Sequence, residues 1–300
     1  MLLRLLLFAM CLLIAISAAF WFRPLAVFFT YSDLRLLAAG ARSHSVTVSQ
    51  IHMHYYVLGP EDGPPVVLVH GLGSRAEDWR NLAPALAKAG HRVYLPDLPG
   101  FGRSEQPAGF SYSIPDQADV VVGFLDAMGL RRVELGGWSM GGWIVQRVAA
   151  AHPERVSKLV LFDSAGIYEV PRWNILLFTP VNENELAQLD ALLMPHPPTV
   201  PSFVARDILR LSDRNAWVIH RALGSMLTGH DTTDSLLPTL KMPVLLEWGS
   251  EDHITPLDQG EKMQNLIPHS QLVVIKGCGH LAPDQCAERM TPSVLDFLKN

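Results

Sequence analysis

The residues most able to do chemistry surround Ser139, which lies among glycines in the stretch 136–142 (GGWSMGG). A short apolar run precedes this stretch and an apolar helical run follows it, which predicts a strand, a sharp turn and a helix. In such a turn the serine has a strained backbone and points its hydroxyl out of the sheet edge, so its neighbours must be nearly free of side chains. Gly137, Gly141 and Gly142 meet this need, and the pattern predicts a serine nucleophile.

A second glycine-rich stretch follows an apolar strand nearer the N-terminus. Val66–Val69 is a continuous apolar run, typical of a strand buried on both faces of a parallel sheet, and the stretch 70–73 (HGLG) comes directly after it. Together with the serine turn, this stretch resembles the α/β-hydrolase fold family. The resemblance implies that the backbone N–H groups of Leu72 and Met140 form an oxyanion hole, which stabilises the oxyanion produced by attack on a carbonyl. We expect His70 to brace this loop.

A serine hydroxyl is a poor nucleophile unless a base accepts its proton, and the base needs an acid partner that fixes its tautomer. The family order is serine, acid, histidine. Asp252 follows the apolar strand 244–248 in a turn that resembles the family's Gly-x-x-Asp, and His280 follows the strand 271–275 in a Gly-His loop. The resemblance therefore implies a triad of Ser139, Asp252 and His280.

Two other acids remain open for the same role. Asp163 comes just after the strand 158–162, where some relatives of the family place the acid, and Glu251 directly precedes Asp252. Asp163 is the second choice and Glu251 the third.

Two further stretches bear on the resemblance. The stretch 97–104 (DLPGFGRS) is similar to a loop common in the family, and we expect Asp97 to hold backbone amides there. It has no Lys-Ser/Thr pair after its glycines, so a phosphate-binding loop is not predicted. After the Gly-His loop the family commonly continues with Pro-x-x-Glu-x-Pro. This chain has Gln285 in place of the Glu and Cys286 in place of the last Pro, which affects the start of the C-terminal helix.

From residue 45 onwards, strands alternate with helices after an opening antiparallel hairpin. This order predicts an α/β fold with a mostly parallel central sheet and helices on both faces. The resemblance implies that this fold is of the α/β-hydrolase type. The predicted elements are hairpin strands at 45–51 and 55–58, helices at 81–89 and 114–128, and strands at 66–69, 92–95 and 132–135.

About eighty residues between Phe162 and Pro243 break the alternation. We expect a helical cap over about residues 165–240, inserted into an α/β-hydrolase domain that spans residues 45–300. Its apolar residues, which include Trp173 and Trp217, serve first as the core of the cap. An apolar cap over a serine nucleophile also predicts a substrate with an acyl chain.

Composition excludes several classes of function. The chain has 300 residues, of which 49% are hydrophobic and 18% charged, enough apolar content for a large core. A net charge of -5 argues against a nucleic-acid partner. Besides Cys11, the chain contains only Cys278 and Cys286, which predict neither a disulfide framework nor a metal site. We expect no metal and no organic cofactor.

Residues 1–44 are predicted to be a separate N-terminal segment. Leu5–Phe22 is eighteen residues without a charge, and as a helix it would span roughly 27 Å, close to the thickness of a bilayer core. We expect an uncleaved single-pass membrane anchor, followed at 25–29 and 34–39 by apolar residues that lie along the membrane. A signal peptide cleaved near Ala19, which would give a secreted or periplasmic protein, is the alternative. The orientation stays open.

Within the family, Ser139 argues against epoxide hydrolases and haloalkane dehalogenases, which have an aspartate nucleophile. The chain resembles membrane-anchored monoacylglycerol lipases in its apolar N-terminus, oxyanion loop, Ser-Met-Gly-Gly turn and apolar cap. This resemblance implies a serine esterase that cleaves lipid-like carboxylic esters through a Ser139 acyl-enzyme. The alternatives are a carbon–carbon bond hydrolase of aromatic ring-cleavage products and a non-catalytic relative that binds a small molecule. The first usually has a Trp after the catalytic histidine, where this chain has Leu281.

Overall fold

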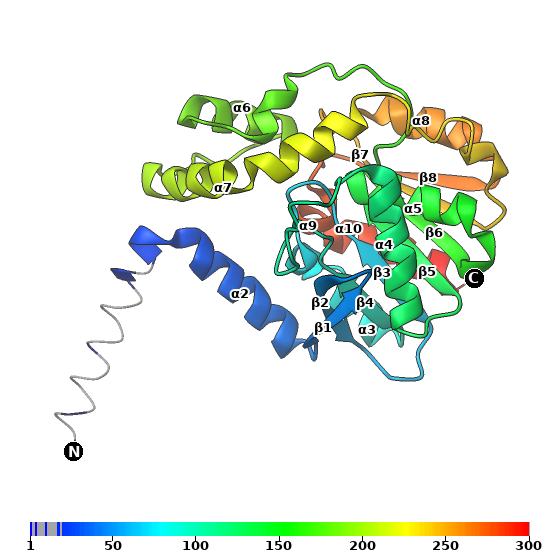
Figure 1. Cartoon of the computed structure of the whole chain (residues 1–300), viewed down its shortest axis with the longest axis horizontal. Coiled ribbons are helices and arrows are strands. Elements are labelled where there is room, and N and C mark those ends of the chain that lie inside the picture. Colours follow the sequence, from blue (N-terminus) through cyan, green and yellow to red (C-terminus); the bar gives the residue numbers. More distant parts are fainter. Residues whose placement is uncertain (2–3, 5–9, 11–16, 19, 300) are drawn as a thin grey trace.

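An eight-stranded sheet runs through the molecule in the order β1-β2-β4-β3-β5-β6-β7-β8. The computed structural model describes residues 20–299 and, before them, residues 1, 4, 10, 17 and 18. β2 pairs antiparallel with β1 and β4, and the other neighbouring strands are parallel. The predicted fold, a mostly parallel sheet opened by antiparallel strands, is confirmed (Figure 1). The strands are β1 (Arg42–Val48), β2 (Ile51–Leu58), β3 (Pro65–Val69), β4 (Arg92–Pro96), β5 (Val133–Trp138), β6 (Val156–Phe162), β7 (Val244–Gly249) and β8 (Ser270–Ile275).

Each face of the sheet is covered by helices, so the central strands are buried on both sides. This explains why they are continuous apolar runs in the sequence. On one face, Val67, Leu135 and Leu161 belong to a core that includes Phe124 and Ile144. The other face has its own core, built on Val66, Leu68 and Val160. The first face is covered by α4 (Ile114–Ala127), α5 (Met140–Ala151) and α8 (Leu257–Leu266), and the second by α3 (Ala83–Lys88) and α10 (Ala287–Lys299).

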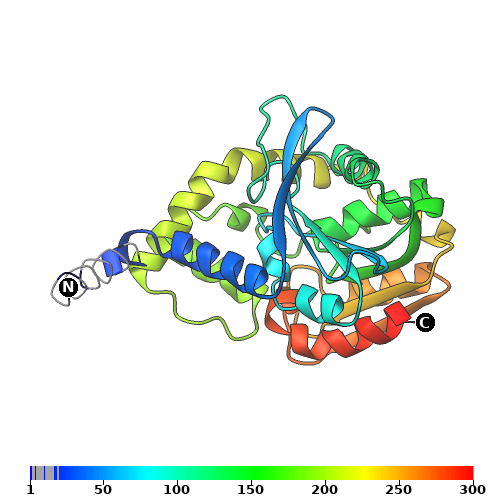
Figure 2. The same ribbon diagram turned by 90° about the horizontal axis from the view of Figure 1, so that it is seen from below.

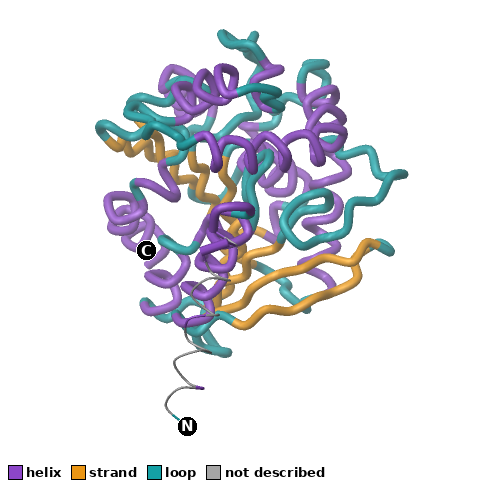
Figure 3. Tube along the Cα trace, turned by 90° about the vertical axis from the view of Figure 1, so that its left-hand side faces the viewer, coloured by secondary structure: helices purple, strands orange, loops and turns teal. Residues whose placement is uncertain are grey.

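The opening hairpin differs from its prediction. The chain turns at Ser49 and Gln50, where the expected strand 45–51 would have continued, and Val48 pairs with Ile51. Both turn residues have positive φ, 48° and 68°. Two-residue hairpin turns need this conformation and usually take Asn-Gly to reach it, so Ser-Gln gave no turn signal. The hairpin of β1 and β2 projects from the body of the sheet (Figure 3).

The segment after residue 23 forms one helix, α2 (Pro24–Ala38), which packs against the protein. The side chains of Ser32 and Leu36 are buried. At the start of α2, the backbone N–H of Leu25 donates to Asp207 Oδ2 of α7 (Ser202–Met226) at 3.1 Å. Figure 2 shows α2 running beside the body of the molecule towards the cap. Apolar residues that were expected to lie along a membrane therefore serve in part as a contact with the protein itself.

Within the described part of the chain, no helix combines the length and the apolar content that crossing a bilayer requires. The predicted anchor, Leu5–Phe22, lies mostly outside the described residues. It stays a prediction.

The segment between β6 and β7 holds four helices, in the place where the alternation of the sequence breaks. Two of them, α6 and α7, lie together at one end of the molecule (Figure 1). We call residues 165–240 the cap. Its helices are η3 (Ile175–Phe178), α6 (Glu183–Leu193), α7 (Ser202–Met226) and η4 (Leu237–Thr239).

Candidate active site

Ser139 stands between β5 and α5 in a conformation that few L-residues adopt. Its φ is 55° and its ψ is −119°. Two glycines make this turn possible. A β-carbon on Gly137 would lie 2.3 Å from the carbonyl oxygen of Gly141, and one on Gly141 would lie 2.3 Å from that of Val69. The predicted strand, turn and helix around Ser139 are thus confirmed, and the glycines are required by close backbone approach.

The hydroxyl of Ser139 lies beside the imidazole of His280. Ser139 Oγ is 2.9 Å from His280 Nε2, and His280 Nδ1 is 2.7 Å from Asp252 Oδ2. The three residues come from the segments that follow β5, β8 and β7, and all three are buried. The structure therefore brings the three residues expected from the sequence together, hydrogen-bonded in the expected order.

Hydrogen-bond donors surround the carboxylate of Asp252. Its Oδ1 accepts from the backbone N–H groups of Ile254 and Thr255 at 2.8 and 2.9 Å, and its Oδ2 accepts from the Thr255 hydroxyl at 2.8 Å. An ionised carboxylate can only accept, so the short contact with His280 requires a proton on Nδ1. Nε2 then presents its lone pair to Ser139, which is the orientation that a general base needs.

The other two candidate acids are differently placed. Asp163 lies just beyond β6, and its Oδ1 accepts from the backbone N–H of Gly249 at 2.7 Å. Burial, reinforced by the nearby charge of Asp252, raises the pKa of Asp163 well above its ordinary range, which favours a neutral acid at this position. The side chain of Glu251 is exposed. Among the described residues neither side chain bonds to His280, so the geometry favours Asp252.

The loop after β3 lies beside Ser139. A β-carbon on Gly71 would lie 3.2 Å from Ser139 Cβ, so this loop lies directly against Ser139. Among the described residues, no acceptor bonds to the N–H of Leu72 or Met140. The oxyanion hole expected at these two amides stays a prediction, and the closeness of the loop to Ser139 is consistent with it.

His70 braces the same loop, as predicted. Its Nδ1–H donates to the carbonyl oxygen of Gly71 at 2.8 Å, and its Nε2 accepts from the backbone N–H of Leu98 at 3.0 Å. Burial lowers the pKa of His70, which fits a neutral ring with one donor and one acceptor. His70 thus ties the loop after β3 to the loop after β4.

Asp97 holds backbone amides, as predicted, and also takes part in a cluster that the sequence did not reveal. It accepts from the N–H groups of Ala76 and Arg103 at 2.7 and 3.0 Å. Its Oδ2 also lies 2.8 Å from His54 Nδ1, while His54 Nε2 lies 2.8 Å from Ser43 Oγ. This second Ser–His–Asp chain was not predicted because Ser43 and His54 lie in no recognised motif. None of the three lines the pocket described below.

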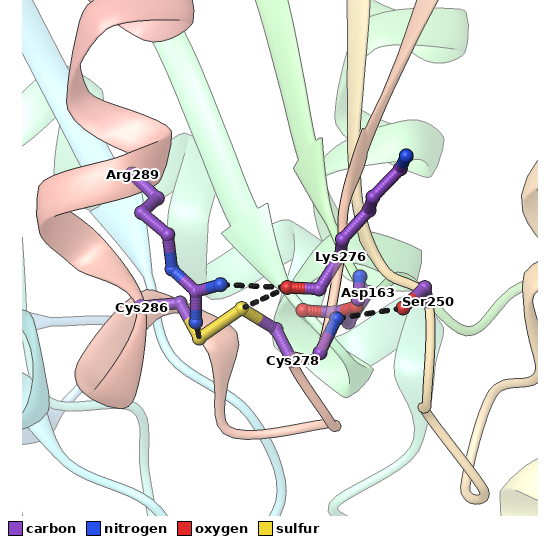
Figure 4. Close-up of a disulfide and its surroundings, with 8 residues drawn as sticks. Asp163, Ser250, Lys276, Cys278, Cys286 and Arg289 are labelled. Carbon is purple, nitrogen blue, oxygen red and sulfur yellow. Dashed lines mark hydrogen bonds between the residues drawn. A yellow bond between two sulfur atoms is a disulfide. The ribbon is translucent and has the colours of Figure 1, made fainter.

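Two contacts on the His280 loop were not predicted. The indole Nε1–H of Trp138 donates to the carbonyl oxygen of His280 at 2.8 Å. Cys278 and Cys286 form a disulfide with their Cα atoms 6.4 Å apart (Figure 4). The expectation that these cysteines make no disulfide framework is therefore corrected, because the two form one disulfide. Pairing depends on the approach of the two β-carbons, and the turn through α9 (Ala282–Gln285) that brings them together has no signal in their spacing.

A pocket of about 240 Å³ opens beside Ser139. Its walls come from the cap, from α5, from the loop after β3 and from the turn that follows β7. Most of the side chains that face it are apolar, so it suits an apolar group of a substrate. The large apolar side chains in its wall are Leu72, Trp143, Ile167, Trp173, Ile175, Phe178, Leu223, Met226, Leu227 and Ile254.

Charged residues in the pocket wall are paired with one another or with neighbours. Arg172 lies 2.6 Å from an oxygen of Asp258 and 3.0 Å from one of Glu169, and Lys262 lies 2.7 Å from the other oxygen of Glu169. Among the described residues, Arg172 is the only Lys or Arg that lines the pocket. Since two carboxylates offset its charge, the pocket offers little net positive potential.

The sequence profile of the α/β hydrolase fold family matches residues 64–194 and 202–285, which is more than half of the chain. The chain belongs to the α/β hydrolase fold family. Its strand order and the turn at Ser139 are those of an α/β hydrolase, and the fold predicted from the sequence is confirmed at this level. The coarse expectation of a hydrolase is supported as well.

Among named relatives, this α/β hydrolase is similar to the 2-hydroxy-6-oxononadienedioate/2-hydroxy-6-oxononatrienedioate hydrolase 2 of Pseudomonas putida. The two are 32% identical over 83% of this chain and 92% of the relative. Among solved structures, it is similar to a membrane phospholipase A described as a bacterial virulence factor, with a TM-score of 0.84, 28% identity, and coverage of 99% of this chain and 98% of the other. A putative lipase from Acinetobacter baumannii AYE has a TM-score of 0.81 and 25% identity over 90% of this chain and 95% of its own. None of these three is named as a monoacylglycerol lipase.

Proposed function

We propose that this α/β hydrolase is a serine esterase that cleaves carboxylic esters with an apolar acyl group. The observation that carries the proposal is the hydrogen-bonded chain from Ser139 through His280 to Asp252, which opens on an apolar pocket. In this proposal Ser139 is the nucleophile, His280 the general base and Asp252 the acid that orients it.

The reaction follows from the positions of these groups. The Ser139 oxygen attacks the ester carbonyl carbon while His280 Nε2 takes the hydroxyl proton, and the N–H groups of Leu72 and Met140 bind the oxyanion that forms. The tetrahedral intermediate collapses with loss of the alcohol, which receives the proton from His280. Water activated by His280 then attacks the acyl-enzyme, releasing the carboxylic acid and restoring the serine hydroxyl.

The charge of the pocket supports a neutral substrate. An apolar acyl chain gains free energy by contact with the apolar wall, whereas an anionic substrate must lose hydration and finds no unpaired cation among the described residues that line the pocket. The similarity to a membrane phospholipase A over 99% of this chain adds support for lipid-like esters, because it includes the N-terminal region.

Carbon–carbon bond hydrolysis is the second candidate, and the similarity to the Pseudomonas putida hydrolase favours it. The name of that relative supports this reading more strongly than the ester reading. Its substrate, a dienedioate by name, has two carboxylates. A pocket for such a substrate needs cationic partners, and here Arg172 would have to leave Asp258 and Glu169 to supply one.

A fluorophosphonate probe on the full chain tests whether the serine is activated. We expect one covalent label, located at Ser139 by peptide mass spectrometry and absent from the Ser139→Ala variant. Ser43 is an internal control, because it also lies in a Ser–His–Asp chain but outside the pocket. No label at Ser139, or equal labelling at Ser43, would contradict the proposed enzyme.

Two substrates separate the candidate reactions. We expect the full chain to hydrolyse p-nitrophenyl esters and monoacylglycerols, and to leave a 2-hydroxy-6-oxo-dienoate unchanged under the same conditions. Faster cleavage of the dienoate than of any ester, with loss of both activities in Ser139→Ala, would establish the second candidate instead.

The N-terminal anchor is a separate proposal with its own experiment. Leu5–Phe22 is long and uncharged enough for a membrane span. After an alkaline carbonate wash, we expect the full-length chain to stay in the membrane pellet. A soluble mature form that begins near Phe20 would show that the segment is a cleaved signal peptide.

A further inference from the structure

A covalent bond closes the loop that carries His280. Cys278, two residues before His280, is joined to Cys286, six residues after it (Figure 4). Both cysteines are buried. The disulfide connects the loop after β8 to the residue before α10, so the backbone on each side of the imidazole has a fixed end point.

The first half of this loop rests on the turn that carries the acid. The backbone N–H of Glu251 donates to the carbonyl oxygen of Cys278 at 2.8 Å, and that of Gly277 donates to Ser250 Oγ at 2.9 Å. A β-carbon on Gly249 would lie 2.5 Å from the same carbonyl oxygen of Cys278. The Cys278 end of the disulfide therefore packs closely against the turn that carries Asp252.

The other end of the disulfide is held by α10. Arg289 of this helix donates from Nη1 to the carbonyl oxygen of Lys276 at 2.6 Å, and its Nη2 lies 2.9 Å from Cys286 Sγ. Figure 4 shows Arg289 reaching from the helix to the strand end beside the disulfide. The disulfide is thus the covalent part of a link between the acid turn and α10.

The pocket does not depend on this loop. None of the residues 277–286 lines it, since its walls come from Ser139 and its helix, the loop after β3, the cap and the turn after β7. A change in the loop can therefore move the imidazole of His280 without reshaping the surface that binds the substrate.

We propose that the Cys278–Cys286 disulfide is a positioning device for His280 in the ester hydrolysis proposed above, and this role rests on that function. With the bond closed, the imidazole stays within hydrogen-bond reach of Ser139 and Asp252. With the bond open, only hydrogen bonds and the packing of Leu281 and Ala282 hold the loop, and the imidazole leaves this geometry for part of the time. Small displacements of a catalytic group lower the rate steeply, so kcat falls while KM stays nearly constant.

Reduction with dithiothreitol tests this role. The dithiol gives two electrons and two protons to the disulfide, which becomes two thiols, while the reagent closes into its own cyclic disulfide. The experiment uses the full chain with Cys11→Ser, so that the pair supplies all the thiols. On complete reduction we expect kcat to fall about tenfold and KM to change less than about twofold. Reoxidation should restore kcat.

The matched control is the Cys278→Ser/Cys286→Ser double variant, which should have the low kcat and should not respond to dithiothreitol. Alkylation and intact mass verify the two thiols, and near-ultraviolet circular dichroism verifies the fold. If the double variant does not fold, the reversible reduction of the parent chain tests the positioning role by itself. If the parent chain resists reduction, the double variant tests it.

Two results would overturn the positioning role: complete reduction with unchanged kcat, or loss of the circular dichroism signal together with activity, which would make the bond merely structural. Failure of the proposed function looks different. In that case the oxidised chain itself neither hydrolyses esters nor takes the fluorophosphonate label at Ser139.

Discussion

Glu247 gives the sharpest test of the energetics of this fold. It lies on β7, two strands from β5, the strand that precedes Ser139, and its side chain is fully buried. Among the described residues, neither carboxyl oxygen has a hydrogen-bond partner of ordinary geometry, although the Ser293 hydroxyl is near enough to interact with the carboxyl group. Burial raises the pKa of Glu247 from 4.5 to about 8, although the nearby Ser293 opposes part of this shift. The folded chain therefore keeps a proton here that the unfolded chain loses.

The size of the effect follows from this shift. Between pH 4.5 and 8 the folded state binds more protons than the unfolded state, so this residue's contribution to stability falls as the pH rises. The slope is about 1.4 kcal/mol per pH unit, and it flattens near pH 8 as the folded form ionises. Between pH 5.5 and 7.5, about 2.5 kcal/mol is lost through Glu247 alone.

Urea unfolding of the parent chain and of Glu247→Gln at the two pH values measures this loss. The stability of Glu247→Gln relative to the parent should rise by about 2.5 kcal/mol between pH 5.5 and 7.5. Other titrating groups cancel in the difference. Glu247→Leu is the matched variant and should show the same rise with pH, because both replacements remove the ionisable group. A difference between parent and variant that stays constant across this range would refute the buried neutral acid.

Three further predictions concern the site. Trp138→Phe removes the indole N–H bonded to the catalytic loop and should lower kcat about fivefold to tenfold in ester assays at unchanged KM. Trp79→Phe, whose indole N–H has no partner among the described residues, should not change kcat; equal loss in both variants would argue against the hydrogen bond. Asp252→Asn should lower kcat by about 10³ to 10⁴ in steady-state kinetics. Asp163→Asn, which replaces a neutral acid, should lower kcat by less than about tenfold. The reverse order would make Asp163 the acid of the triad. Gly141→Ala puts a β-carbon 2.3 Å from the carbonyl oxygen of Val69. The clash should lower the free energy of unfolding by about 1–3 kcal/mol, measured by thermal unfolding. An unchanged unfolding midpoint would show that the turn can widen.

The features predicted from the sequence are those fixed by short local constraints. The turn at Ser139 was found because close backbone approach demands glycine at fixed offsets, and the buried strands were found because their apolar runs are continuous. The hairpin turn at Ser49 and Gln50 was missed because its residues adopt positive φ without glycine or asparagine.

The features that the sequence did not reveal depend on contacts between distant elements. The disulfide of Cys278 and Cys286 needs a fold that returns the chain on itself, and the bond from Trp138 to His280 joins residues 142 positions apart. The contact of the N-terminal segment with the cap also joins distant parts of the chain. The apolar residues of this segment could equally have faced lipid. Hydrophobic periodicity indicates that one face of a helix is buried, but it does not indicate whether that face packs against protein or lies in lipid.

The positive φ of Ser139 implies that the proposed reactivity of this residue and the stability of the fold place opposite demands on this position. A side chain at φ 55° stores steric energy that glycine does not. Ser139→Gly should consequently be inert and should melt at a higher temperature than Ser139→Ala, which keeps the β-carbon. A strained serine at this position therefore fits the proposed use of its hydroxyl oxygen as the nucleophile.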